Sequence, residues 1–103
     1  MEDKMIKHVI LWKLKDASEE ELVKIKADVK RELEALNGKI EGLIDLKIYT
    51  EALPTSNADM MLDSSFESTD ALAHYQSHPL HQAAANNYVR PFAQVRLCLD
   101  FEA

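Results

Sequence analysis

The sequence predicts an α+β domain with the element order β-α-β-β-α-β. Three observations predict it: segments of alternating apolar residues, segments with apolar residues at helical spacing, and capping or turn residues between them. This order matches the split βαβ, or ferredoxin-like, motif, in which a four-stranded antiparallel sheet carries both helices on one face. At 103 residues the chain is expected to form a single domain, spanning residues 1–103.

The first strand and the first helix have the clearest patterns. Residues 5–15 alternate and are rich in β-branched side chains, which predicts a strand whose inner face carries Ile6, His8, Ile10, Trp12 and Leu14. A helix is predicted from Ser18, because a serine followed three residues later by Glu21 forms a capping box. Apolar residues at helical spacing continue to Leu36, and Asn37-Gly38 ends the helix. The charged residues of this helix are expected to face solvent.

Three further strands complete the predicted sheet, over 43–50, 59–66 and 94–101. We expect the helices to cover the face formed by Ile10, Trp12, Leu46, Ile48, Met60, Leu62, Leu97 and Leu99. The opposite face then carries Val9, Leu11, Tyr49, Met61 and Cys98. That second face is too apolar to remain in water, so two sheets are expected to pack face to face across a twofold axis. The sequence therefore predicts a homodimer.

The second helical region contains a break. Ser68 or Thr69 is expected to cap a helix that bears Leu72 and Tyr75. Proline disfavours the helical conformation of the residue before it, so the helix should end near His78. Pro79 should then begin a further helical segment that runs to about Val89.

The residues around this break can carry acid–base chemistry. His81 is the candidate base, because the positive end of a helix dipole keeps an imidazole neutral. Tyr75 is the candidate donor to a carbonyl oxygen. His8 lies on the same face as Ile10 and Trp12, and it is expected to reach the same space beneath the helices. This set predicts cofactor-free proton abstraction next to the carbonyl group of a small metabolite.

Each of these residues also has a structural interpretation. His78 fits a cap on the segment after the break, and His74 fits a surface position. His81 fits a partly buried residue at a helix start, while Tyr75 and His8 fit core packing. The sequence leaves the catalytic and the structural interpretations open.

Several other site classes are not expected. The proline disturbs the common helix face that His74, His78 and His81 would need to bind a metal, so no metal site is predicted. Cys98 has apolar neighbours and no activating cation, so nucleophilic catalysis is not predicted. Two glycines in the chain leave no phosphate-binding loop.

Charge and composition limit the partners and the location. Twelve basic and 18 acidic residues give a net charge of −6, so neither nucleic acid nor an anionic membrane is an expected partner. Residues 53–103 contain only two of the basic residues, and this half is expected to be more buried. No long apolar segment predicts a leader or a membrane span. A single cysteine fits a reducing compartment, so a cytoplasmic protein is expected.

The early strand 7–15 (KHVILWKLK), the strand end Phe66-Glu67-Ser68, the run 75–81 (YQSHPLH) and the closing Leu99-Asp100-Phe101 resemble the stress-responsive dimeric A/B barrel (Dabb) family. The resemblance implies a ferredoxin-like protomer whose sheet pairs with a second one into a dimeric α/β barrel. One family member, olivetolic acid cyclase, is a cofactor-free cyclase. By the shared motif its catalytic histidine and tyrosine fall on His81 and Tyr75, and its first-strand pocket histidine falls on His8. Its first helix contributes aromatic residues to the pocket, whereas the first helix here offers Ile25, Val29 and Leu33.

The leading hypothesis is a stress-response-type Dabb homodimer with an apolar small-molecule pocket and cyclase, isomerase or lyase chemistry. Its catalytic residues would be His81 and Tyr75, and its substrate-binding residues would be His8, Ile10, Trp12 and His78. One alternative is a non-catalytic small-molecule-binding or stress-protective module, in which the same residues only line the pocket. A second alternative is a cofactor-independent or haem-dependent monooxygenase, because such enzymes use a similar dimeric barrel.

Overall fold

A computed structural model describes residues 5–103, and within them the predicted element order is present. The strands are β1 (Ile6–Leu14), β2 (Leu43–Tyr49), β3 (Met60–Phe66) and β4 (Ala93–Glu102). The helices are α1 (Glu19–Glu34), α2 (Thr69–Ser77), α3 (Pro79–Ala84) and the π-helical turn η1 (Ala85–Val89). The sequence predicts no leader segment at the N-terminus, and residues 1–4, which this prediction includes, lie outside the described residues.

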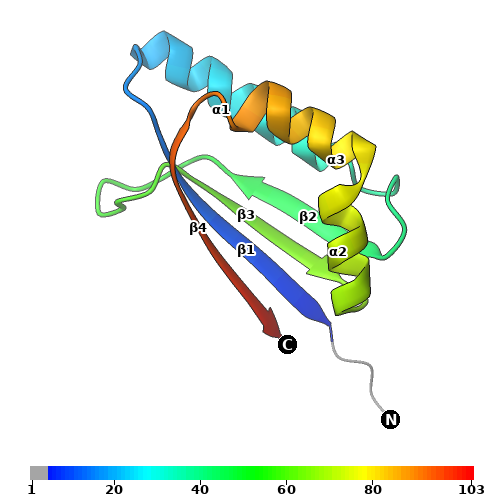
Figure 1. Cartoon of the computed structure of the whole chain (residues 1–103). Coiled ribbons are helices and arrows are strands. Elements are labelled where there is room, and N and C mark those ends of the chain that lie inside the picture. The colour runs from blue at the N-terminus through cyan, green and yellow to red at the C-terminus, as the bar shows by residue number, and fades with distance from the viewer. Residues whose placement is uncertain (1–4) are drawn as a thin grey trace.

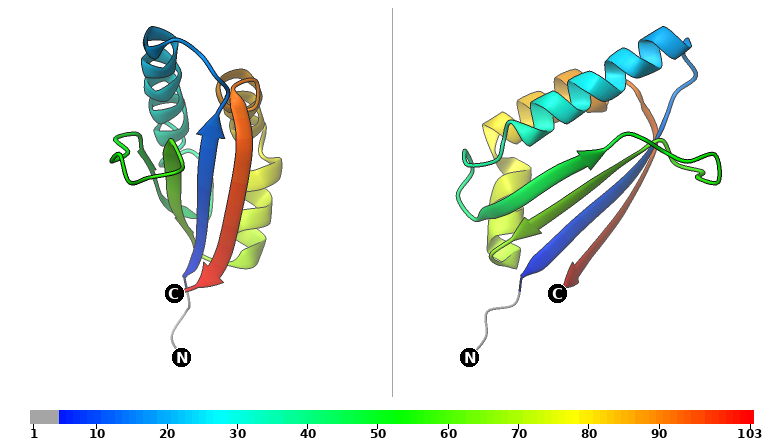
Figure 2. Two further views of the ribbon diagram at one scale, coloured as in Figure 1. Left: turned by 90° about the vertical axis from the view of Figure 1, so that its left-hand side faces the viewer. Right: turned by 180° about the vertical axis from the view of Figure 1, so that it is seen from behind.

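The strands form one antiparallel sheet in the order β2-β3-β1-β4, so β2 and β4 are its edges. All helices lie on one face of this sheet (Figure 1). The left view of Figure 2 looks onto the opposite face, which no helix covers. Among residues 5–103 no helix is long and apolar enough to cross a membrane.

The start of α1 follows from its capping residues. The Glu21 backbone N–H donates to Ser18 Oγ over 3.2 Å, and the Ser18 hydroxyl donates to Glu21 Oε1 over 3.1 Å. Three glutamates in the first turn suit the positive end of the helix dipole. After the last turn, Gly38 has φ +79°, a conformation that favours glycine. The capping residue is therefore as the sequence predicts, whereas the helix ends at Glu34, earlier than predicted, and Gly38 lies in the turns that follow it.

The core lies between the helices and the inner face of β1, β2 and β3. Val29 and Leu33 of α1 are fully or almost fully buried, as are Leu62 and Phe66 of β3. Burial of such side chains stabilises the fold by about 1.5–3 kcal/mol each. The predicted inner residues of the first three strands, including Ile10, Trp12, Leu46, Ile48 and Met60, are all in this core.

The prediction for the faces of β4 is wrong. Leu97 pairs with Leu11 and Leu99 pairs with Val9, and directly paired residues of antiparallel strands share a face. Both leucines therefore lie on the outer face, where they are 63% and 64% exposed. Because side chains alternate along a strand, Arg96, Cys98 and Asp100 lie on the helix side instead. The outer face is thus more apolar than the sequence analysis expects.

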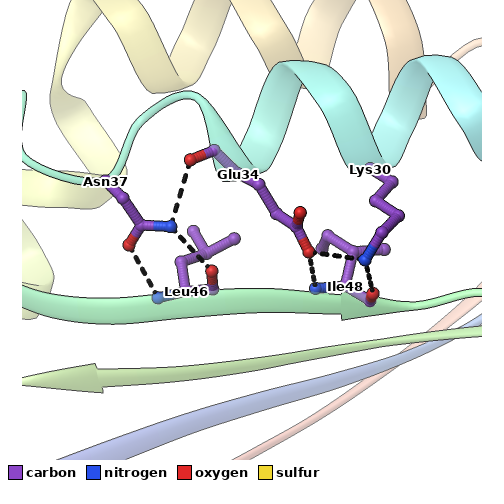
Figure 3. Close-up of polar contacts among 5 residues, drawn as sticks. All are labelled: Lys30, Glu34, Asn37, Leu46 and Ile48. Atoms are coloured by element: carbon purple, nitrogen blue, oxygen red, sulfur yellow. Dashed lines mark hydrogen bonds and ion pairs between the residues drawn. The ribbon is translucent and has the colours of Figure 1, made fainter.

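The free edge of β2 is covered by polar side chains of α1 and of the turn after it (Figure 3). Asn37 donates to the Leu46 carbonyl and accepts from the Leu46 N–H. Glu34 accepts from the Ile48 N–H, and Lys30 donates to the Ile48 carbonyl. Lys30 and Glu34 are therefore edge-capping residues, whereas the sequence analysis places them on a solvated face.

Candidate functional site

The break between α2 and α3 frees one backbone carbonyl. In a continuous helix the Gln76 carbonyl would accept from the N–H of Leu80. Here the Leu80 N–H donates to His78 Nδ1 over 3.1 Å, because Pro79 begins a new helix with His78 as its cap. The Gln76 carbonyl instead accepts from His81 Nδ1 over 3.2 Å. The His-Pro sequence thus creates the acceptor that holds the His81 ring.

This bond also determines the tautomer of His81. A carbonyl oxygen only accepts hydrogen bonds, so His81 Nδ1 carries the proton and Nε2 has a free lone pair. Burial lowers the pKa of His81 below its usual 6.5, and the positive charges of Arg90, His8 and Arg96 lower it further, opposed by the bond to Gln76. The ring is therefore neutral at pH 7, as predicted, but burial rather than a helix dipole is the main cause.

Tyr75 contacts His81 directly. The two ring centroids are 4.2 Å apart, and Tyr75 is only 1% exposed. Its hydroxyl is buried and has no hydrogen-bond partner among the described residues. Burial raises the pKa of Tyr75, an effect that the charge of Arg96 partly opposes, so the hydroxyl remains a donor at neutral pH. An unpartnered buried hydroxyl is costly, and a ligand acceptor would remove that cost.

His8 reaches the same space from β1 and is held by the edge strand. It pairs with Asp100 in the β1–β4 ladder, and His8 Nδ1 lies 2.5 Å from Asp100 Oδ1. His8 is 2% exposed, while the Asp100 side chain is 43% exposed. Because Nδ1 of His8 is bonded to Asp100, Nε2 is the ring nitrogen that can bond to a ligand. Asp100 is therefore a positioning partner of His8.

A cavity of about 90 Å³ lies between the helices and the sheet. Five of the six predicted site residues line it: His8, Ile10, Trp12, Tyr75 and His81. His78 is outside the lining, and its ring caps α3 and contacts His74. The structure thus assigns His78 a capping role and corrects its placement in the pocket.

The cavity also has lining residues that the sequence analysis misses. Arg90, at the end of η1, and Arg96, on β4, both line it and are both exposed. Asp100 reaches His8 only because of the β1–β4 register. The available signal in the sequence is that residues 53–103 contain just two basic residues, and these are the same two arginines.

One group of metal-ligating side chains occurs in residues 5–103: His8, Cys98 and Asp100. Cys98 Sγ lies 3.6 Å from His8 Nδ1 and 3.5 Å from Asp100 Oδ1. Ligand atoms of a tetrahedral zinc ion with bonds of about 2.0 Å lie about 3.3 Å apart. The 2.5 Å separation of His8 Nδ1 and Asp100 Oδ1 is that of a hydrogen bond, so this pair would have to open to admit a metal. Burial is the main cause that raises the pKa of Cys98, and the hydrogen bond to Asp100 and the charge of Asp100 raise it further. The raised pKa disfavours the thiolate form of Cys98.

A larger hollow of about 470 Å³ lies on the outer side of the sheet. It is lined by Leu11, Tyr49 and Met61 and by the loop after β2. None of the predicted site residues lines it. It belongs to the apolar outer face rather than to the histidine site.

A known family model matches most of the chain. The model of the stress responsive A/B barrel domain matches residues 6–103. The chain belongs to the Dabb family. An uncharacterized Streptomyces coelicolor protein is 35% identical over 83 residues, which cover 77% of this chain and 81% of that protein. The predicted family is therefore confirmed.

Solved structures of the Dabb fold confirm the ferredoxin-like class. A dimeric Bacteroides fragilis protein of unknown function and ferredoxin-like fold is 30% identical, with TM-score 0.90 and 96% of each chain covered. A hydroxynitrile lyase from Passiflora edulis has TM-score 0.75 at 16% identity, covering 99% of this chain and 95% of that one. A putative antibiotic biosynthesis monooxygenase from Nitrosomonas europaea has TM-score 0.77 at 10% identity, covering 100% and 93%. The last two likenesses show the fold alone.

Proposed function

We propose that this Dabb protein binds a small carbonyl-bearing metabolite and catalyses proton transfer next to its carbonyl group. The observation that carries the proposal is the buried Tyr75 hydroxyl, which has no hydrogen-bond partner within residues 5–103 and lies beside the neutral His81 in a cavity. Both residues have the protonation state that the reaction needs at pH 7, because burial lowers the pKa of His81 and raises that of Tyr75.

The proposed step breaks a C–H bond adjacent to the carbonyl. His81 Nε2 takes the proton, and the electron pair of the bond moves to form the C=C bond of an enolate. The Tyr75 hydroxyl donates a hydrogen bond to the oxygen on which the negative charge develops. Return of the proton from His81 to another atom gives isomerisation. Attack of the enolate carbon on a second carbonyl forms a C–C bond and leaves an alkoxide, which takes the proton back from His81, and this gives cyclisation. These steps require no cofactor.

The remaining lining residues hold the substrate in this geometry. Ile10 and Trp12 form an apolar wall, and His8 contacts the substrate from β1 while Asp100 fixes its ring. The reverse of the cyclisation step, in which a C–C bond breaks and leaves an enolate, gives lyase chemistry with the same two residues. The reaction class is therefore proposed as cyclase, isomerase or lyase, with the substrate size limited by the cavity.

The test measures exchange of protons for deuterium in D₂O by ¹H NMR. The protons followed are those of the methyl group next to the ketone carbonyl of methyl pyruvate, and the ester methyl group is not involved. We expect wild-type protein to accelerate exchange above the protein-free rate. We expect His81→Ala to abolish the acceleration and Tyr75→Phe to reduce it about 10²-fold, as for loss of an oxyanion donor. His74→Ala is the matched control, because His74 is exposed and lies outside the cavity.

Three results would contradict the catalytic proposal. Equal exchange rates for wild type and His81→Ala would remove the base. Saturable shifts of cavity resonances by methyl pyruvate, without accelerated exchange, would favour the non-catalytic binding module instead. A Soret change on haem addition would favour the monooxygenase alternative.

We also propose that the protein is a homodimer whose sheets face each other. The outer face carries six side chains that are each at least 39% exposed, namely Leu11, Tyr49, Val95, Leu97, Leu99 and Phe101. An apolar area of this kind favours burial against a second copy. The similar Bacteroides fragilis protein is described as dimeric.

Light scattering at micromolar concentration tests this dimer. We expect wild-type protein to have twice the chain mass and Leu97→Lys to be monomeric. Val23→Lys is the matched control, because Val23 is 69% exposed but lies on α1. A monomeric wild-type protein would contradict the proposed interface.

A further inference from the structure

We propose that the ligand of this cavity carries a carboxylate, bound by Arg90 and Arg96 beside the carbonyl group that Tyr75 engages. The ligand class is thus a short oxo acid. This inference rests on the proposed function, because it specifies the substrate of the same site. It is carried by the position, the bonding and the charge surroundings of the two arginines.

Arg90 and Arg96 belong to the exposed part of the cavity lining. Ile10, Trp12, Leu62 and Tyr75 form its buried lining, whereas Arg90 and Arg96 are exposed lining residues. They come from different elements, since Arg90 follows η1 and Arg96 lies on β4. The exposed part of the lining therefore carries positive charge from two different elements.

Arg90 is held in place by neutral groups only. Its Nη1 donates to Gln82 Oε1 over 3.1 Å and also to Asn86 Oδ1. Gln82 is itself fixed, because its Nε2 donates to the Gln76 carbonyl that also holds His81. Both bonds use Nη1, so Nη2 and Nε of Arg90 have no hydrogen-bond acceptor among the described residues. Nη2 and Nε form the edge of a guanidinium that binds a carboxylate through two parallel bonds.

Arg96 approaches the cavity from the edge strand. It pairs with Trp12 in the β1–β4 ladder, which places it on the helix side of the sheet. Its charge partly opposes the burial that raises the pKa of Tyr75, and it adds to the burial that lowers the pKa of His81, so it acts on both proposed catalytic groups. Within residues 5–103 neither Arg96 nor Arg90 forms an ion pair with a carboxylate.

The two arginines differ in this respect from three basic residues of α1. The protein has a net charge of −6, and Lys24, Lys30 and Arg31 on α1 are all paired with acidic residues. Residues 53–103 contain six acidic residues and only these two basic ones. The nearby carboxylate on the same face, Asp100, is bonded to His8. The positive charge at the cavity is therefore available to an anion from solution.

The dimensions favour a short ligand. A cavity of about 90 Å³ has room for a few non-hydrogen atoms, so the carboxylate and the carbonyl must be close together in the ligand. A carboxylate at the arginines also neutralises the charge that lowers the pKa of His81. Binding of the acid therefore makes His81 a stronger base when substrate is present.

The test compares two probes that differ in charge, pyruvate and its neutral methyl ester. Dissociation constants are measured by ¹H–¹⁵N NMR titration of wild type, Arg90→Gln, Arg96→Gln and the control Arg31→Gln. Arg31 is the matched control, because it loses the same charge but lies on α1 outside the cavity. We expect each cavity variant to weaken the binding of pyruvate about tenfold, as for loss of a charge-assisted hydrogen bond. The dissociation constant of the methyl ester should stay unchanged.

Salt provides a second measurement. Raising the ionic strength from about 0.15 M to 1 M shortens the Debye length from about 8 Å to 3 Å. Binding of pyruvate should therefore become weaker, whereas binding of the ester should not change. Equal losses for both probes in the cavity variants, or an equal loss of pyruvate binding in Arg31→Gln, would overturn the carboxylate assignment. Ester exchange that still depends on His81 and Tyr75 would then leave the proposed function standing. Loss of that dependence, with intact pyruvate selectivity, would overturn the chemistry and leave the anion site.

Discussion

The two edges of the sheet are treated in opposite ways. At β2, Asn37, Glu34 and Lys30 bind the N–H and carbonyl groups of the edge strand, and α1 packs over it (Figure 3). At β4, no helix packs closely, and every residue from Gln94 to Glu102 is exposed (Figures 1 and 2). The β2 edge is the closed edge, because side chains of the same chain bond to its backbone N–H and carbonyl groups. The β4 edge is the open edge, because its outward backbone groups can bond to another molecule.

The side chains at the two edges have different roles, those at β2 in stability and those at β4 in ligand binding. The side chains that close the β2 edge bind backbone groups and have no role in the cavity. The side chains on the helix side of β4, Arg96 and Asp100, bind no backbone and instead reach the cavity and His8. We infer that changes at the β2 edge mainly affect folding and changes at the β4 edge mainly affect the ligand.

The largest expected effect is from a core deletion at the closed edge. Leu46 of β2 is 1% exposed, so Leu46→Ala should cost about 2–5 kcal/mol of unfolding free energy. Cys98→Ala on the open edge should cost less than about 1 kcal/mol, because Cys98 is exposed. Urea unfolding at one protein concentration measures both. Similar losses at the two positions would remove the proposed distinction.

The next effect comes from the edge-capping side chain itself. Asn37→Ala removes the donor to the Leu46 carbonyl and the acceptor of its N–H, and should cost about 1–3 kcal/mol. Amide hydrogen exchange of Leu46 should also become faster. Asn57→Ala, in the exposed loop after β2, is the control and should change neither measurement.

A smaller effect is expected in the pH dependence of stability. Burial tends to raise the pKa of Glu34, but the bonds from the Ile48 N–H and Lys30 outweigh it and hold the pKa below 4.5. A lowered folded-state pKa stabilises the protein above the unfolded value, and that stability is lost as pH falls through the folded pKa. Glu34→Gln should therefore lose about 1 kcal/mol at pH 7 and much less at acid pH. A loss that is the same at pH 7 and pH 3 would contradict the role of its charge.

The smallest effect is a shift in the pH profile at the open edge. Because the pKa of His81 lies below 6.5, methyl pyruvate exchange should be constant near pH 7 and fall as the pH drops and His81 becomes protonated. The groups that face His81 are the Gln76 carbonyl, Tyr75, Arg90, His8 and Arg96. Arg96→Gln removes one positive charge, so the acid limb should move to higher pH. Asn37→Ala should leave the limb in place.

Much of the local structure follows from short-range signals in the sequence. Ser18 and Ser68 cap the helices, and Pro79 breaks the second helical region at His78. The inner residues of β1, β2 and β3 were also predictable, because their alternation leaves one clearly apolar face. The π-helical turn at Ala85–Val89 carries no such signal, since only the backbone hydrogen-bond pattern distinguishes it from an α-helix.

The candidate site was predictable in part. The motif around Pro79 indicates His81 and Tyr75, and the alternation of β1 brings His8, Ile10 and Trp12 to the same face. Asp100 and Arg96 were not found, because their roles depend on which strand β4 pairs with and in which register. Arg90 was not found, because its role depends on where the end of η1 lies in the fold. A shift of one residue in that register would send all of its side chains to the other face.

The sequence by itself determined the element order, the caps, the helix break and the two alternating sets of side chains on β4. Only the tertiary structure decided which of these sets faces the helices. Alternation shows that Val95, Leu97, Leu99 and Phe101 share a face, but burial within one chain and burial against a second copy favour the same apolar residues. The pairing of β4 with β1 resolves this, and it places the leucines outside and the arginine and aspartate beside the cavity.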